Sequence, residues 1–264
     1  MLKRELKVNL KSFIIWTLIL VGLFLMVFLI YPSLIADENI TDMNEMMKMF
    51  PEDVLKAFNM DISGIDSAFG WLKTEGFVFV LLITGVYSSI LGSNILLKEE
   101  NDKTIEYLIG LPVTRKSIAL SKIVCGIIYI VLMITILGVF NYFGLLFSGD
   151  FDKKLYLLLS ITPLFSSLLI FAICLFISTF AHKTKKVFGL SLGIVFISYF
   201  LQIVSEMSDK TEFLKYVSIF TLADTRNVIT ENTLNPIIVL ISIFLTVLFL
   251  GMSVFHYEKK ELIS

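Results

Sequence analysis

The chain has 264 residues, of which 56% are hydrophobic and 17% are charged. This composition would leave a soluble protein of this length with an uncovered apolar surface, so it excludes an ordinary water-soluble domain. The net charge of −1 provides no general basic surface, and no nucleic-acid partner is expected. Because Cys125 and Cys174 both lie in apolar segments, neither a disulfide framework nor a cysteine metal site is expected.

The first residues, before the first apolar run, predict an amphipathic helix on the membrane surface. Leu2, Leu6, Leu10 and Phe13 recur near helical spacing, and basic residues occupy the other faces. Such a helix would lead directly into the first span. A positive anchor that fixes the topology explains the same charges.

Six apolar runs, each of roughly 18 residues or more, contain no acid or base and indicate the fold class. Each is long enough to cross the hydrocarbon layer of a membrane. They occupy residues 13–32, 76–97, 123–147, 157–181, 187–204 and 237–255, and the third predicted span begins slightly earlier, at residue 119. The pattern predicts an all-α membrane protein with six transmembrane helices in one domain, residues 1–264.

The loops between these runs alternate in charge. Of the 22 lysines and arginines, 14 fall on the side of the amino terminus, whereas 16 of the 23 acids fall on the other side. Because retained basic loops set orientation, both termini are predicted to be cytoplasmic. We expect a multi-pass protein in the lipid bilayer of a cell membrane, and specifically in the plasma membrane of a bacterium. Lys183, Lys185 and Lys186 fit this topology, with contact to anionic lipid as the alternative.

The longest outer loop, residues 33–75, contains nine acids and three lysines and is predicted to pack on the outer face as a lid or gate. A second outer excursion spans residues 205–236. Its apolar stretch, 213–222, is predicted to dip into the membrane.

The inner loop at residues 98–118 carries the sharpest signal. Asn101 or Asp102 can cap a short helix, which Gly110 and Pro112 would end. Three apolar side chains would share one face of that helix: Ile105, Leu108 and Ile109. Such a helix is either an interfacial connector or an apolar contact for a cytosolic partner.

The same loop contains an acidic pair, then Thr-x-Glu-x-Leu, then Leu-Pro-Val-Thr-Arg. These positions are Glu99, Glu100, Thr104, Glu106, Leu108, Leu111, Pro112, Val113, Thr114 and Arg115. In these motifs the chain resembles the membrane subunits of ABC-2 type transporters, although Lys103 replaces their usual glycine before the threonine. The resemblance implies that residues 98–118 form a coupling segment that docks on a separate ATPase. By that resemblance the candidate ATPase contacts are Glu99, Glu100, Thr104, Glu106, Leu108, Leu111, Pro112 and Arg115.

The resemblance also implies the permease subunit of an ATP-driven exporter, which pairs with a second copy or a sister permease and with ATPases. ATP would be bound by the partner, so no cofactor, metal or catalytic residue is expected in this chain. A phosphate loop at 110–117 is rejected, because Arg115 stands at its second glycine and Pro112 interrupts it. The charge-free runs argue against an ion-driven carrier. A non-transporting membrane scaffold, or an immunity or sensor protein, is the alternative.

Small and mildly polar residues in the second and fifth runs would let helices approach closely. They are Gly85, Ser89, Ser93 and Asn94 in the second run, and Gly189 and Gly193 in the fifth. Packing within one subunit is one interpretation, and a dimer seam or conduit wall is the other. The apolar, mildly polar interior favours a peptide, lipid or amphipathic drug over a small ion.

Overall fold

The structure is a computed structural model, which describes residues 1–34, 67–105, 112–207, 210–223 and 225–261. All regular secondary structure in these residues is helical, with no strand among them. Six helices are long and apolar enough to cross a membrane. The predicted all-α membrane protein with six spans is therefore confirmed.

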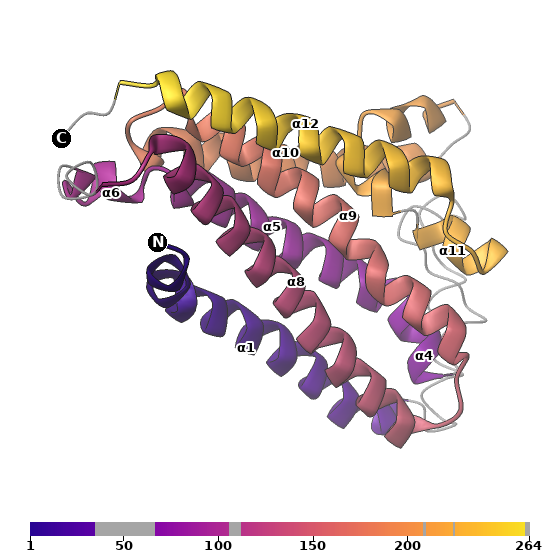
Figure 1. Ribbon diagram of the computed structural model, residues 1–264. Helices are drawn as coiled ribbons and strands as arrows, with labels where there is room; N and C mark the ends of the chain where they lie inside the picture. The colour runs from indigo at the N-terminus through magenta and orange to yellow at the C-terminus, as the bar shows by residue number, and fades with distance from the viewer. Residues whose placement is uncertain (35–66, 106–111, 208–209, 224, 262–264) are drawn as a thin grey trace.

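The six long helices form an elongated bundle (Figure 1). They are α1 (Leu2–Leu34), α5 (Phe77–Ile95), α8 (Arg115–Ser148), α9 (Lys153–Ser178), α10 (Thr184–Met207) and α12 (Pro236–Lys259). Shorter elements connect them: α4 (Ala68–Trp71), η2 (Leu72–Gly76), α6 (Lys98–Asn101), η3 (Glu212–Tyr216), η4 (Ile219–Ala223) and α11 (Thr225–Glu231). Both chain termini and α6 lie at one end, called the terminal end here, whereas α4 and α11 lie at the opposite, distal end (Figure 1).

The sequence explains where several long helices begin. Side-chain oxygens of Thr114, Asp152 and Asn235 accept backbone N–H groups in the first turns of α8, α9 and α12. Pro236 follows Asn235 as the first residue of α12, where its missing N–H costs no helical bond. Gly149 ends α8 with a φ of 141°, a backbone conformation that glycine adopts easily before the chain turns back into α9.

The second span begins earlier than the sequence predicted. The helical stretch runs over Ala68–Ile95, whereas the apolar run begins at residue 76. Ser67 caps this stretch by accepting the N–H of Gly70 at 3.0 Å. The π-helical turn η2 contains Lys73 and Glu75. Because of these two charges, the sequence predicts a loop in this part of the chain.

The first helix is continuous, so the predicted surface helix and the first span form one element. Figure 1 shows the first turns end-on and the rest from the side, so α1 changes direction near its start. Its buried face contains Glu5, Asn9 and Phe13, spaced four residues apart, while Leu10 is exposed. The predicted apolar line is therefore buried in part, since Leu2 and Leu6 pack partly buried against the core beside two polar residues that point toward the bundle.

Helix α9 lies at the centre of the packing and contacts α5, α8, α10, α12 and η4. It approaches α5 tightly at Gly92, where a Cβ atom would lie 2.6 Å from the backbone oxygen of Phe171. The Ser167 hydroxyl of α9 also donates to Thr84 Oγ1 of α5 at 3.1 Å. Small residues thus allow these two helices to pack almost backbone to backbone.

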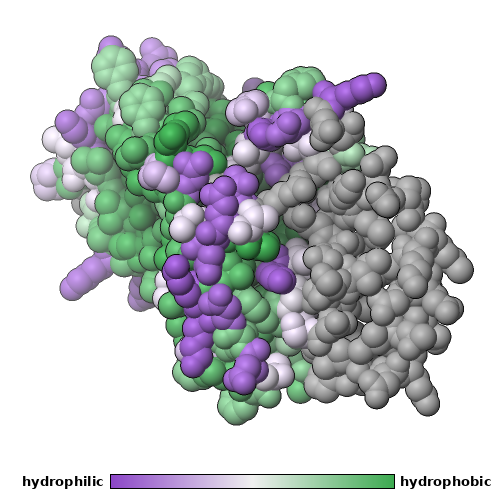
Figure 2. Space-filling view, turned by 90° about the vertical axis from the view of Figure 1, so that its right-hand side faces the viewer, coloured by the Kyte–Doolittle hydropathy of each residue, from purple (hydrophilic) through white to green (hydrophobic). Residues whose placement is uncertain are grey.

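The excursion before α12 packs into the bundle through η4. Phe220 is buried, and a Cβ atom at Gly85 of α5 would lie 3.0 Å from its Cζ. Seen from the distal end, hydrophilic side chains form a band down the middle of the molecule, with a broad apolar surface to its left (Figure 2). An apolar flank beside a polar end is the distribution that a bilayer requires.

Candidate functional site: a buried charged junction

Five buried charged side chains meet at the terminal end of the bundle. Glu5 comes from α1, Glu99 and Glu100 from α6, Lys122 from α8, and Lys260 directly follows α12. Each residue is at most 6% exposed. Buried charges are costly unless they are paired and hydrogen-bonded. We call these five residues the charged junction.

Glu99 belongs to the first arm of the junction, which connects α6 with α8 and α1. Lys122 Nζ lies 2.8 Å from Glu99 Oε2 and 3.2 Å from Glu5 Oε2. The same ammonium group donates to the backbone oxygen of Ile95 at 2.7 Å. One buried cation therefore joins three helical elements that are far apart in sequence.

Glu100 belongs to the second arm, which connects α6 with the end of α12 and with the loop between α9 and α10. Its Oε1 accepts a hydrogen bond from Lys260 Nζ at 2.6 Å, and its Oε2 lies 2.9 Å from His182 Nδ1. Lys260 also donates to the backbone oxygen of Ala181 at 2.5 Å. Burial lowers the pKa of Lys260 from its usual value, and the hydrogen bond to Glu100 opposes that shift.

The two neighbouring carboxylates serve different parts of the molecule. Successive residues in a helix point about 100° apart, which follows from 3.6 residues per turn. Glu99 consequently faces α1 and α8, while Glu100 faces the C-terminal segment and His182. The two acidic residues therefore bind different parts of the molecule and do not duplicate one function.

The buried groups alone do not balance in charge, since three carboxylates face two ammonium groups. Arg4 is placed to compensate, because its Nη2 lies 3.9 Å from Glu99 Oε1 while its side chain is 47% exposed. Arg4 thus has a specific partner in the structure. Arg4 therefore does more than contribute positive charge that sets the orientation of the chain in the membrane.

Further hydrogen bonds fix both ends of the segment 98–118. Arg115 donates to the backbone oxygens of Lys260 at 2.8 Å and of Glu258 at 3.3 Å. On the other side, the N–H of Thr184 at the start of α10 donates to Asn101 Oδ1 at 3.1 Å. The segment therefore begins and ends in contact with other helices of the bundle.

The structure places the predicted ATPase contacts in different surroundings. Glu99 and Glu100 point into the bundle, so their carboxylates face this chain and not the solvent. Thr104 is half-buried and its N–H donates to the backbone oxygen of Glu99 at 2.9 Å. Pro112 and Arg115 are exposed. The three remaining candidates, Glu106, Leu108 and Leu111, lie outside the described residues.

The predicted helix cap in this segment is wrong. Asn101 is the last residue of α6 and Asp102 follows it, so both stand at a helix end. Lys103 then adopts a φ of 52°, which turns the chain out of the helical path. Of the three apolar residues expected on one face, Ile105 is buried, while Leu108 and Ile109 lie outside the described residues.

The candidate packing residues divide into two groups. Those of α5 pack within the chain: Gly85 lies against Phe220, Ser89 and Ser93 are buried, and Asn94 Oδ1 accepts from the Thr184 hydroxyl at 3.1 Å. Gly189 and Gly193 of α10 differ, because a Cβ atom at either position would meet no described atom within 4 Å. Packing within the described part of the chain explains the first group only.

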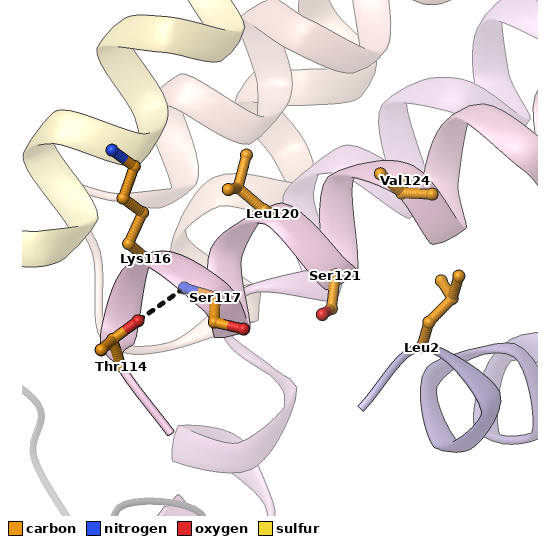
Figure 3. Close-up of a pocket in the computed structure, with 7 residues that line it drawn as sticks. All are labelled: Leu2, Thr114, Lys116, Ser117, Leu120, Ser121 and Val124. Carbon is orange, nitrogen blue, oxygen red and sulfur yellow. Dashed lines mark hydrogen bonds between the residues drawn. The ribbon is translucent and has the colours of Figure 1, made fainter. Parts of the chain in front are cut away.

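Two hollows accompany these features. One of about 360 Å³ lies at the terminal end between Leu2 and the start of α8, where Ser117 and Ser121 are exposed to it (Figure 3). Lys116 also lines this hollow, and Figure 3 shows its side chain extending away from Leu2. The other, of about 500 Å³, is mostly apolar and lies between α8 and α9, with Thr135 and Ser160 among its lining.

Within the described ranges, no three His, Cys, Asp or Glu side chains are grouped to hold a metal ion. The geometry instead consists of a charged junction at one end of a six-helix apolar bundle. A sequence model of the ABC-2 family transporter proteins matches residues 1–262. The chain belongs to the ABC-2 transporter family. No curated protein matches it.

Membership of the ABC-2 family identifies this chain as a multi-pass membrane protein and a permease component of an ABC transporter. Permeases of this family are not themselves catalytic and associate with an ABC ATPase. The sequence motifs that resembled the family thus indicated the right class.

The charged junction of this ABC-2 protein was not predicted from the sequence. One signal was present, because Lys122 lies inside the predicted third span, 119–147, immediately before its apolar run. Glu5 likewise lies inside α1 as the structure defines it. The long helices therefore contain buried charges at their terminal ends, although the apolar runs themselves contain none.

Proposed function

We propose that this ABC-2 protein is the permease of an ATP-driven exporter in a cell membrane, with both termini in the cytoplasm, and that a separate ATPase acts on residues 98–118. The supporting observation is that this segment is bonded to the bundle at both ends, through Glu99 and Glu100 and through Arg115. A segment held in this way passes a displacement to the helices instead of absorbing it. ATP is bound and hydrolysed by the partner.

The burial of Glu99 and Glu100 changes their proposed role from ATPase contact to support of the segment. The contact itself falls to the remaining candidates, Glu106, Leu108 and Leu111, together with exposed Pro112 and Arg115. This division fits the usual arrangement of a binding surface, in which buried residues hold the residues that touch the partner.

A second permease, identical or related, completes the proposed transporter. The outward face of α10 at Gly189 and Gly193 supports this assignment, because small residues allow a neighbouring helix to approach closely. The apolar hollow between α8 and α9 supports a peptide, a lipid or an amphipathic drug as the exported substrate.

Co-purification from the native cell tests the proposed coupling. The loop variant combines Glu106→Lys with Leu111→Ala, and its matched control combines Lys154→Glu with Leu157→Ala, two exposed positions near the distal end. We expect an ATPase subunit with the wild type and the control, and its loss with the loop variant. Equal amounts of inserted protein in all three samples exclude misfolding as the cause.

Two results would contradict the proposal. An ATPase that remains bound to the loop variant would place the contact elsewhere on the chain. A correctly inserted wild type without any ATPase companion would favour the scaffold, immunity or sensor function, or a self-sufficient carrier.

A further inference from the structure

We infer that Glu5 and Lys122 are positioning residues that make the first turns of α1 move together with the segment 98–118. The inference deepens the proposed function, and what it means for transport rests on that proposed function. The geometric statement, that these residues hold α1 in register with α6, concerns the isolated chain alone.

Lys122 is arranged as a three-way connector. An ammonium group has three N–H donors. Lys122 uses them on the carboxylate of Glu5, the carboxylate of Glu99 and the backbone oxygen of Ile95, at 3.2, 2.8 and 2.7 Å. Its side chain is fully buried. A satisfied and buried group of this kind has one arrangement, so it fixes the relative positions of the elements that it joins.

The first turns of α1 attach to the bundle through apolar packing of Leu2, Leu6 and Phe13 and also through polar groups of α8. The amide nitrogen of Asn9 lies 4.0 Å from Cys125 Sγ, and the Tyr129 hydroxyl donates to the backbone oxygen of Leu6. These contacts hold α1 to α8 and do not involve α6. The connection from α1 to α6 runs through Lys122 and, at the edge, through Arg4.

Burial makes this connection stiff. Charges in a low-dielectric interior attract each other more strongly than exposed charges, and separating them would leave a buried charge without a partner. A displacement of α6 is therefore passed to α8 and α1. The second arm, through Glu100 and Lys260, reaches other helices, so the buried ion pair of α1 can be removed without changing the second arm.

Spin labels at Lys7→Cys and Asp102→Cys measure the separation between α1 and the end of α6. Both positions are exposed, and the native Cys125 and Cys174 are buried, so labelling is selective. The test variant is Glu5→Met, which removes the buried ion pair between α1 and Lys122 but leaves Lys122 paired with Glu99 and leaves Arg4 beside Glu99. The matched control is Lys3→Met, an exposed change on the same turn.

We expect one narrow distance distribution in the wild type and in Lys3→Met, and a broader one in Glu5→Met. If Glu5→Met fails to insert, a triple variant decides instead: Glu5→Gln, Lys122→Met and Glu99→Gln leave no charge in the first arm and are expected to broaden the distribution as well. A distribution that superimposes on the wild type in either variant would overturn the inference.

The complex with the ATPase extends the test to transport. Upon trapping with ATP and vanadate, the wild-type distance should stay constant, because both labels move together, whereas the Glu5→Met distance should shift. A shift of the same size in the wild type would overturn the inference. Failure to find any ATPase would count against the proposed function alone, because the isolated chain already gives the first measurement.

Discussion

Lys103 adopts a backbone conformation that favours glycine. Its φ of 52° lies in the left-handed region, where a side chain meets the following carbonyl oxygen. This is the position at which the resembled ABC-2 loops commonly carry glycine, so the structure supplies a physical reason for that preference. The lysine therefore retains a local strain at the turn after α6, inside the proposed coupling segment.

Replacing Lys103 by glycine should relieve this strain. We expect the free energy of unfolding to rise by about 1 kcal/mol, because the left-handed region costs a residue with a Cβ atom roughly 1–2 kcal/mol and the greater chain entropy of glycine offsets part of the gain. The control is Asp102→Gly, whose native φ of −82° needs no glycine and which should not stabilise the protein. Unfolding midpoints in detergent compare the two variants, and equal shifts would mean that the backbone at Lys103 is not strained.

The acidic pair shows what the sequence could and could not reveal about single residues. Its presence in the loop, and the loop's resemblance to ABC-2 permeases, were readable from the chain. The partners of Glu99 and Glu100 were not, because Glu5, Lys122 and Lys260 are far away in sequence and no periodicity links them. Pairing across such separations depends on how the helices pack, which a single sequence does not express.

At the scale of helices, glycines mark two different kinds of contact. Gly92 of α5 lies against the backbone of α9, where a Cβ atom would come within 2.6 Å of the Phe171 oxygen. Gly189 of α10 faces open space in the described chain. The sequence pattern of spaced small residues looks alike in both helices, so it could not separate internal packing from an outward face.

The two glycines should therefore respond differently to alanine. We expect Gly92→Ala to lower the free energy of unfolding by about 1–3 kcal/mol, because a backbone atom cannot make room for the added methyl group. Gly189→Ala should leave the isolated chain unchanged or raise this free energy by up to about 1 kcal/mol through better helix propensity. Denaturant titration of both variants tests this contrast, which equal losses would contradict.

The boundaries of the membrane spans were also only partly predictable from the sequence. The apolar runs located all six spans, because lipid selects hydrophobic length directly. The start of the second span was displaced, since Lys73 and Glu75 interrupt the hydropathy pattern while the backbone stays helical through η2. Ser67, which caps this stretch, was the local signal that could have corrected the boundary.

For the whole molecule, the bundle has two chemically distinct ends and an apolar flank. Both termini, α6 and the charged junction occupy the terminal end, and the turn between α8 and α9 lies at the distal end. The excess of basic residues on the side of the termini predicts which end faces the cytoplasm.

Cysteine labelling in intact cells tests this orientation. A membrane-impermeant maleimide should react with Lys154→Cys near the distal end, and should react with Lys116→Cys near the terminal end only after the membrane is opened. Both positions are exposed, and the buried native cysteines should remain unlabelled. The reverse pattern of reactivity would invert the proposed topology.

The three-way contact at Lys122 has a consequence for how this protein can diverge. Losing one member of the set Glu5, Glu99 and Lys122 changes the charge of a buried site, so a single substitution there is costly until a second one compensates. We therefore expect substitutions at these three positions to occur together. In an alignment of relatives, the residues at positions 5, 99 and 122 should change in concert, whereas exposed Lys116, six residues before Lys122, should vary independently.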